Sequence, residues 1–223
     1  YVKHFQAKRK FLFFPIIQKD QDFRLLLENA LPVSKILEDT YHLEGRQVLL
    51  FVGRLIDIKN LFFLLDALAL VVNRYPKVIL LFVGDGDQRV ALERHAERNG
   101  LADHVIFAGK KQGEDLYACY NVGQIFILPS YYERFGAVVN EALLAGCYTL
   151  CSVVAGAACL IEPQKNGDLF DPASKTYLAE KLAQSLKDCE GLKQISLKAN
   201  KMCYSYDQYI TSFFNQLNSI IDK

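Results

Sequence analysis

The sequence predicts an α/β fold built on a doubly wound, Rossmann-like parallel sheet with helices on both faces. Short runs of apolar residues alternate with segments whose apolar residues recur at three- and four-residue spacing, which is typical of amphipathic helices. The short runs are apolar at nearly every position, which indicates strands buried on both faces, as in a parallel sheet. With 223 residues, 51% of them hydrophobic and 23% charged, the chain can bury a large core without a disulfide or a metal.

These patterns place each element in turn. Strands that alternate with helices form parallel sheets, and such sheets bind their ligands beyond the carboxyl ends of the strands. Functional residues are therefore expected directly after each strand. The strands are expected at residues 48–52, 78–83, 105–108, 124–128 and 148–152. The helices between them are expected at residues 61–73, 88–99, 114–121 and 137–145.

The chain is predicted to divide into a lead-in and one domain. Residues 1–46 are interpreted as a linker with helices at 21–30 and 33–42, separated by Pro32, because proline interrupts a helix. Residues 47–223 are interpreted as a single Rossmann-like domain that ends in helices.

The charge balance and the cysteines limit the classes of function. Lys and Arg number 26 against 25 Asp and Glu, a net charge of +1, so no overall field would attract nucleic acid. There is no CxxC pair, and most cysteines lie in apolar runs, so we expect reduced core thiols in a cytoplasmic protein and no disulfide framework. The six are Cys119, Cys147, Cys151, Cys159, Cys189 and Cys203.

Two segments could contact a membrane. Residues 142–161 carry no charge and are long enough to span a bilayer, but their glycines and hydroxyl side chains favour a helix, a turn, a strand and a second helix. Residues 8–14 are basic and aromatic. A solvated linker is favoured for them, with peripheral contact at the inner face of the membrane as the alternative. The start lacks a signal-peptide pattern, and Met202 is the only methionine, so we interpret the chain as a fragment or as lacking its leading residues.

The first functional motif follows the first expected strand. It reads Gly53-Arg54-Leu-Ile-Asp-Ile-Lys59-Asn60. A glycine at a strand end allows a ligand to approach the backbone, and two cations five residues apart can converge on one phosphate group. Asn60 is expected to cap the next helix. The alternative is that Arg54 and Lys59 are ordinary surface charges.

The second motif, Val83-Gly84-Asp85-Gly86-Asp87, follows the second expected strand. It is predicted to form a tight turn whose backbone amides face a ligand, with Asp87 capping the next helix. The two aspartates also fit the Asp-x-Asp pattern that holds a divalent metal on a nucleotide diphosphate. Both interpretations stay open at this point.

The third motif is the most informative and follows the fourth expected strand. It runs from Pro129 to Gly146 and contains Glu133, Gly136 and Glu141. Gly136 is expected to open a helix whose first amides are unpaired, an arrangement that binds phosphate. Glu141 lies about 6 Å along that helix, where its carboxylate could accept hydrogen bonds from a sugar diol. Because its neighbours are apolar, we also expect it to have a polar partner. The alternative is that both glutamates are ordinary charges.

Together the motifs resemble a known family. Pro-Ser-x-x-Glu-x-Phe-Gly-x-Val-x-x-Glu-Ala, preceded by Gly-Arg-Leu-x-x-x-Lys-Asn and Val-Gly-Asp-Gly, resembles the C-terminal, donor-binding half of group 1 glycosyltransferases of the GT-B fold. The likeness extends from about residue 48 to residue 188 and includes Asn-Gly-x-Leu-Phe-x-Pro at residues 166–172, interpreted as a turn. The chain departs from the family at Tyr148, where proline is usual, and at residues 156–161.

The resemblance implies a role for each candidate residue. Arg54, Lys59 and Glu133 would be the catalytic residues, with the two cations on the diphosphate and Glu133 on the donor sugar. Glu141 would bind the ribose, and residues 109 and 110 would border the base. The donor-binding residues implied are Gly53, Gly84, Gly86, Gly109, Lys110, Phe135, Gly136, Ala137, Val138 and Glu141.

The implied function is retaining transfer of a sugar from a nucleotide diphosphate to a glycan or lipid-linked acceptor, without a metal or other cofactor. The segment before residue 48 is too short for the family's acceptor-binding domain, so that domain is expected to be missing and the fragment to be inactive alone. The alternatives are a nucleotide-sugar epimerase of the same fold and a non-catalytic module that binds nucleotide sugars.

Overall fold

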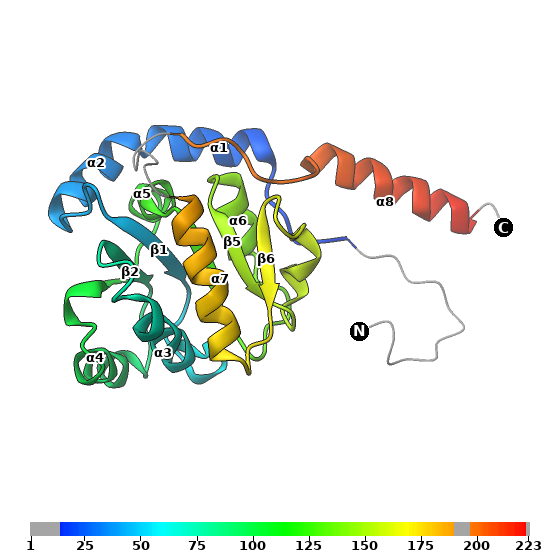
Figure 1. The fold of residues 1–223 in the computed structure, drawn as a ribbon. Helices are drawn as coiled ribbons and strands as arrows, with labels where there is room; N and C mark the ends of the chain where they lie inside the picture. Colours follow the sequence, from blue (N-terminus) through cyan, green and yellow to red (C-terminus); the bar gives the residue numbers. More distant parts are fainter. Residues whose placement is uncertain (1–13, 190–196, 222–223) are drawn as a thin grey trace.

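A six-stranded parallel sheet forms the centre of the structure. The computed structural model describes residues 14–189 and 197–221, and its strands lie in the order β3-β2-β1-β4-β5-β6 (Figure 1). This order places β1 beside β4, at the point where the winding of the chain reverses. The strands are β1 (Gln47–Val52), β2 (Val78–Val83), β3 (Val105–Gly109), β4 (Ile125–Leu128), β5 (Tyr148–Ser152) and β6 (Gly167–Phe170).

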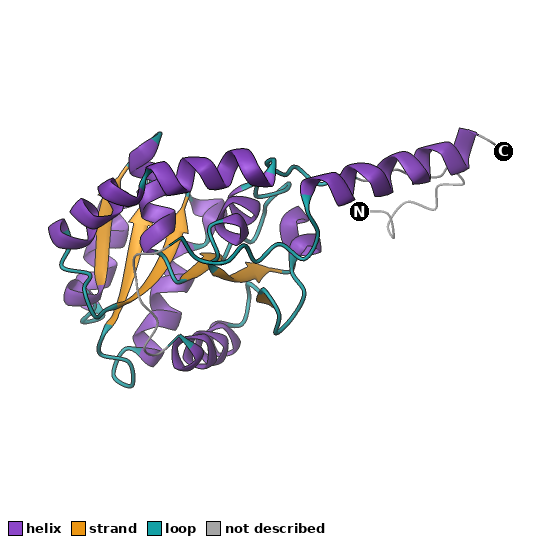
Figure 2. Cartoon of the chain, turned by 90° about the horizontal axis from the view of Figure 1, so that it is seen from above, coloured by secondary structure: helices purple, strands orange, loops and turns teal. Residues whose placement is uncertain are grey.

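Helices cover both faces of this sheet, so the predicted fold class is confirmed (Figure 2). One face packs against α1, α2, α5 and α6, and the other against α3, α4 and α7. Within β1, Leu50 and Val52 lie in the first core, whereas Leu49 and Phe51 lie in the second, as the pleat of a strand requires. The helices are α1 (Asp20–Asn29), α2 (Leu31–Thr40), α3 (Leu61–Val71), α4 (Arg89–Arg98), α5 (Glu114–Val122), α6 (Val138–Leu144), α7 (Lys175–Asp188) and α8 (Tyr206–Ile221).

The two lead-in helices are confirmed and pack onto the sheet domain. Pro32 lies in the first turn of α2, where its missing amide hydrogen costs nothing. On α1, Phe23 and Leu27 are buried in the same core as the strands. At the other end of the chain, α8 projects away from the body of the molecule (Figures 1 and 2).

The sixth strand corrects the prediction of a turn at residues 166–172. Gly167–Phe170 instead pairs in parallel with β5 at the edge of the sheet. Its buried Asp168 forms an ion pair with Lys181 of α7 at 3.3 Å and accepts a hydrogen bond from the Tyr148 hydroxyl at 2.9 Å. A buried carboxylate breaks the apolar pattern by which a strand is predicted, and only the fold supplies its partners.

The uncharged segment at residues 142–161 is divided among elements as predicted. It contributes to α6, forms β5 and continues into a short 3₁₀ helix at Gly156–Leu160. No helix among the described residues is long and apolar enough to cross a membrane. Of the basic aromatic segment at residues 8–14, all but Phe14 lies outside the described residues, so its membrane contact stays a prediction.

All six cysteines are free thiols, and four of them are buried as predicted. Burial raises the pKa of Cys119 to about 12. The prediction of core thiols is wrong for the other two, because Cys159 is exposed and Cys203 is half-buried. Cys159 lies in the 3₁₀ helix that follows β5, and Cys203 lies in the irregular segment before α8. The four buried thiols are Cys119, Cys147, Cys151 and Cys189.

Lys198 anchors the segment between α7 and α8 to the sheet domain. Its ammonium donates to the carbonyl oxygens of Asn121 at 2.8 Å and Tyr120 at 3.3 Å, and also to that of Gly123. These oxygens lie at the C-terminal end of α5, where helix carbonyls lack partners and the helix dipole favours a cation. The ammonium therefore caps α5 from a part of the chain that is distant in sequence.

Replacing Lys198 with Met is expected to lower the free energy of unfolding by about 2 to 3 kcal/mol, because charge-assisted hydrogen bonds are lost and carbonyls are left unpaired. Urea denaturation followed by circular dichroism measures the change. Lys187→Met, at an exposed position of α7, is the control and should change stability by less than about 0.5 kcal/mol. Equal values for the two variants would contradict the anchoring role.

Candidate functional site

A cleft lies where β1 and β4 separate. The two strands are paired only at Leu49 with Ile125 and Leu50 with Phe126, so the pairing ends two residues before the carboxyl end of each strand. Open α/β sheets bind ligands at this reversal of strand order. The cleft has a volume of about 470 Å³, which is within the range of small-molecule sites.

Seven predicted site residues line this cleft, although they come from two loops far apart in the sequence. One loop follows β1, and the other connects β4 to α6. The structure therefore brings the first and third motifs together at one place. The seven are Gly53, Arg54, Lys59, Glu133, Gly136, Ala137 and Val138.

Lys59 and Glu133 form an ion pair at the cleft, and each side chain is only 15% exposed. Tyr131 ties the same two loops together, because its amide donates to the carbonyl of Ile58 at 3.2 Å and its hydroxyl donates to Asp57. The hydrogen bond to Asp57 raises the pKa of Tyr131. The loop after β4 is thus fastened to the loop after β1, and the charge of Lys59 is balanced by Glu133 in this state.

Two arginines supply the uncompensated positive charge of the cleft. Arg54 and Arg134 line it, are exposed, and have no ion-pair or side-chain hydrogen-bond partner among the described residues. Arginine suits phosphate because its planar guanidinium can donate two parallel hydrogen bonds. Arg134 is not among the residues predicted from the sequence. The sequence signal that could have identified Arg134 is its position directly after Glu133 in the third motif.

Backbone amides complete the wall of the cleft on the side of α6. Gly136 has φ +91, and a β-carbon there would lie 2.7 Å from the side chain of Leu128, so this turn requires glycine. Helix α6 begins at Val138, one residue later than predicted, and has seven residues. The amides of Gly136, Ala137 and Val138 donate to no acceptor within the described part of the chain, so they can donate to a ligand.

Glu141 has the partner that its apolar surroundings predict. The hydroxyl of Tyr120, a fully buried residue of α5, donates to Glu141 Oε2 at 2.6 Å. Glu141 itself is half-buried and lies on α6, about one turn beyond Val138. Phe135 is only 9% exposed and packs into the core beneath the cleft. The sequence contains no signal that pairs Tyr120 with Glu141.

The other predicted residues follow β2 and β3 and do not line this cleft, although Gly84 lies against the backbone of Gly53. The amide of Gly84 donates to the carbonyl of Gly109 at 2.9 Å, and that of Gly86 donates to the Asp85 side chain at 2.8 Å. Lys110 is exposed. The roles implied for these four donor-binding residues therefore stay predictions.

Two predicted helix caps are wrong. Asn60 precedes α3 with a left-handed backbone, and its side chain donates to the carbonyl of Pro172 at 3.0 Å instead of capping the helix. Gln88, and not Asp87, occupies the N-cap position of α4, with no side-chain cap. Within the described ranges, no three His, Cys, Asp or Glu side chains are grouped so that they could hold a metal. The metal alternative needs only the two carboxylates of Asp85 and Asp87 beside a nucleotide diphosphate, so it stays a prediction.

The comparison with protein families agrees with this fold. The family model described as glycosyl transferases group 1 matches residues 34–202. The chain belongs to the group 1 glycosyltransferase family, and its sheet has the architecture of the GT-B fold.

Two curated relatives illustrate the likeness in sequence. An uncharacterized glycosyltransferase of Methanocaldococcus jannaschii is 30% identical over 161 residues, which are 72% of this chain and 41% of the relative. The sulfoquinovosyl transferase of Arabidopsis thaliana is 28% identical over 192 residues, which are 85% of this chain and 34% of the relative. The chain thus spans less than half the length of these relatives.

Two solved structures share the fold. The Anabaena protein HepE in complex with UDP has a TM-score of 0.70 and 22% identity, and the match covers 96% of this chain and 57% of HepE. The C-terminal domain of the group 1 protein LpcC from Francisella tularensis has a TM-score of 0.63 and 20% identity. That match covers 91% of this chain and 96% of the LpcC domain.

Proposed function

We propose that this chain is the donor-binding domain of a retaining glycosyltransferase that uses a nucleotide-diphosphate sugar. One observation carries the proposal. At the reversal of strand order, a single cleft combines two unpartnered arginines, the Lys59–Glu133 ion pair and three backbone amides with no acceptor in the described chain. A diphosphate is an anion of suitable size for such a cleft, because each of its oxygens can accept hydrogen bonds from amides or guanidinium groups.

The chemistry follows from the charge that develops during transfer. As the bond between the sugar and the diphosphate lengthens, negative charge grows on the departing diphosphate. Cations and amides already aimed at it stabilise the transition state more than the ground state. Arg54 and Lys59 are assigned this role, with each charge-assisted contact contributing about 1.5 to 3 kcal/mol. Glu133, released from Lys59 by the diphosphate, would accept hydrogen bonds from hydroxyls of the donor sugar.

The choice of probe comes from a structural neighbour. HepE of Anabaena was crystallised with UDP and with UDP-glucose, so uridine nucleotides are the first to test on this chain. The proposal further includes a glycan or lipid-linked acceptor, bound by a domain outside this chain, and a cytoplasmic location. In this proposal, protein side chains balance the negative charge of the diphosphate, and no metal or other cofactor is included.

UDP is expected to raise the melting temperature of this chain without added metal, because it binds the folded state. Arg54→Ala and Glu141→Ala should each abolish that rise. Differential scanning fluorimetry with UDP, GDP and ADP in the presence of EDTA measures it, with Lys187→Ala as a control that keeps the rise. If none of the nucleotides shifts the parent chain, the donor site is disproved. A shift that requires Mg²⁺ or Mn²⁺ would instead support the metal alternative at Asp85 and Asp87.

A further inference from the structure

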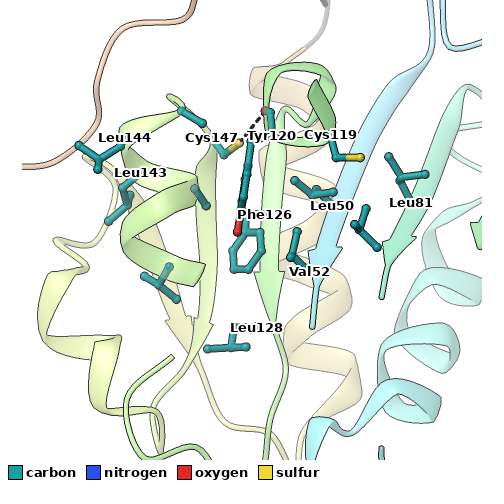
Figure 3. Close-up of a cluster of buried hydrophobic side chains, with 14 of the residues drawn as sticks. Leu50, Val52, Leu81, Cys119, Tyr120, Phe126, Leu128, Leu143, Leu144 and Cys147 are labelled. Carbon is teal, nitrogen blue, oxygen red and sulfur yellow. Dashed lines mark hydrogen bonds between the residues drawn. The ribbon is translucent and has the colours of Figure 1, made fainter. Parts of the chain in front are cut away.

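Tyr120 is a buried titratable residue that the proposed chemistry does not use. It has no exposed surface, and its ring extends from α5 toward Phe126 and Leu128, in the direction of the carboxyl end of β4 (Figure 3). Its hydroxyl donates to Glu141 Oε2 at 2.6 Å. The contact therefore joins the buried side of the sheet to the helix that borders the cleft.

The direction of this hydrogen bond is fixed. Burial, and then the neighbouring Glu141 carboxylate, raise the pKa of Tyr120 well above its ordinary value, so the phenol keeps its proton and acts as the donor. Glu141 Oε1 has no hydrogen-bond partner within the described ranges. One oxygen of the carboxylate is thus held from beneath, while the other is left for a ligand.

We propose that Tyr120 is a positioning residue, whose hydroxyl holds Glu141 Oε2 so that Oε1 is presented to the ribose hydroxyls of the bound nucleotide. The inference rests on the proposed function, which assigns the ribose to Glu141. A free glutamate side chain loses rotational freedom when it binds a ligand, and this loss weakens binding. The hydrogen bond from Tyr120 already restricts the rotation of the Glu141 side chain before the nucleotide binds, so less rotational freedom is lost on binding.

A purely structural role for Tyr120 makes a different prediction. If the hydroxyl only satisfies a half-buried carboxylate, its removal lowers stability and leaves discrimination among ligands unchanged. If it positions Glu141, its removal weakens binding only for nucleotides that carry the ribose hydroxyls. The ratio of affinities for UDP and 2′,3′-dideoxy-UDP separates these cases, because both ligands carry the same base and diphosphate.

The experiment compares Tyr120→Phe, Glu141→Gln and the matched control Tyr117→Phe with the parent chain, by isothermal titration calorimetry at one salt concentration. Tyr117 lies on the same helix, and its hydroxyl has no hydrogen-bond partner among the described residues. Tyr120→Phe is expected to weaken UDP binding about fivefold, the scale of one hydrogen bond, and to leave dideoxy-UDP binding unchanged. Tyr117→Phe should leave both affinities unchanged.

The outcomes distinguish the inference from the proposed function. If the preference for UDP over dideoxy-UDP falls in Glu141→Gln but not in Tyr120→Phe, the positioning role of Tyr120 is disproved while the proposed function stands. If this preference is unchanged in Glu141→Gln, Glu141 does not bind the ribose. The positioning role of Tyr120 is then disproved as well, while the proposal of a diphosphate-binding cleft is unaffected. Failure of the parent chain to bind any nucleotide disproves both.

A second measurement covers the case in which Tyr120→Phe does not fold. In the parent chain labelled with ¹³Cζ-tyrosine, the Tyr120 resonance reports the hydrogen bonding of its hydroxyl and can be assigned by its displacement in Glu141→Gln. It is expected to move when UDP is added and to stay in place when dideoxy-UDP is added. A resonance that responds identically to both nucleotides would overturn the positioning role.

Discussion

Lys59→Ala is expected to lower the turnover of the intact glycosyltransferase about a hundredfold, the scale of removing one preorganised group from a developing charge. The ammonium already lies in the cleft, paired with Glu133 and 15% exposed. Water therefore screens it less than it screens a surface lysine, and its interaction with the departing diphosphate is stronger. Steady-state kinetics on the full-length protein, with the donor identified by thermal shift, measure kcat and KM separately. The loss is expected mainly in kcat.

Two variants make this result specific to Lys59. Lys187→Ala removes an exposed lysine of α7 that does not line the cleft, and it should leave kcat within about twofold of the parent. Glu133→Gln releases Lys59 from its ion pair, so it should tighten binding of UDP while lowering turnover, because the contact with the donor sugar is lost. Unchanged turnover in Lys59→Ala would remove this residue from the mechanism.

Gly84→Ala is expected to destabilise the fold by more than about 4 kcal/mol, among the largest effects of a single substitution. Gly84 has φ +143, and a β-carbon there would lie 1.8 Å from the carbonyl oxygen of Gly53. Both atoms belong to neighbouring backbones at the ends of β1 and β2, so neither can move aside as a flexible side chain could. Urea denaturation, or the yield of soluble protein, measures the loss.

Gly100→Ala is the matched control for Gly84→Ala. Gly100 also has a positive φ, +69, but a β-carbon there would have no neighbour within 4 Å. The cost should be only that of the left-handed backbone, about 1 kcal/mol. If the two variants were equally stable, the close approach of the strand ends would not be the reason for glycine at position 84.

The elements predicted from the sequence are those whose pattern is local. Each of the five expected strands is present, helices α1 to α6 lie at or near their expected places, and the chain ends in helices as expected, because an apolar run or a helical spacing is visible within a few residues. Strand β6 has no such local pattern. Its buried Asp168 is stable in a strand only because Lys181 of α7 and Tyr148 of β5 provide its partners.

The helix caps and the detailed contacts of the site also depend on residues that are distant in sequence, so local patterns did not predict them. Asn60 is a suitable residue for a helix cap, but its side chain binds the Pro172 carbonyl beyond β6, a tertiary contact that outcompetes the local one. The role of Arg134 in the wall of the cleft depends on how the loop after β4 folds. The hydrogen bond from Tyr120 to Glu141 joins two helices whose facing sides no local pattern reveals.

Apolar spacing and the order of the motifs were enough to predict the parallel sheet, its helices and the family, since both are properties of residues that are neighbours along the chain. Three features of the site became visible only in the folded molecule: the neutralisation of Lys59 by Glu133, the convergence of Arg54 and Arg134 on one cleft, and the support of Glu141 from within the core. The physical reason is that charge pairing and hydrogen bonding depend on distances in space, and those distances are fixed only when the loops after β1 and β4, and helices α5 and α6, come together in the fold.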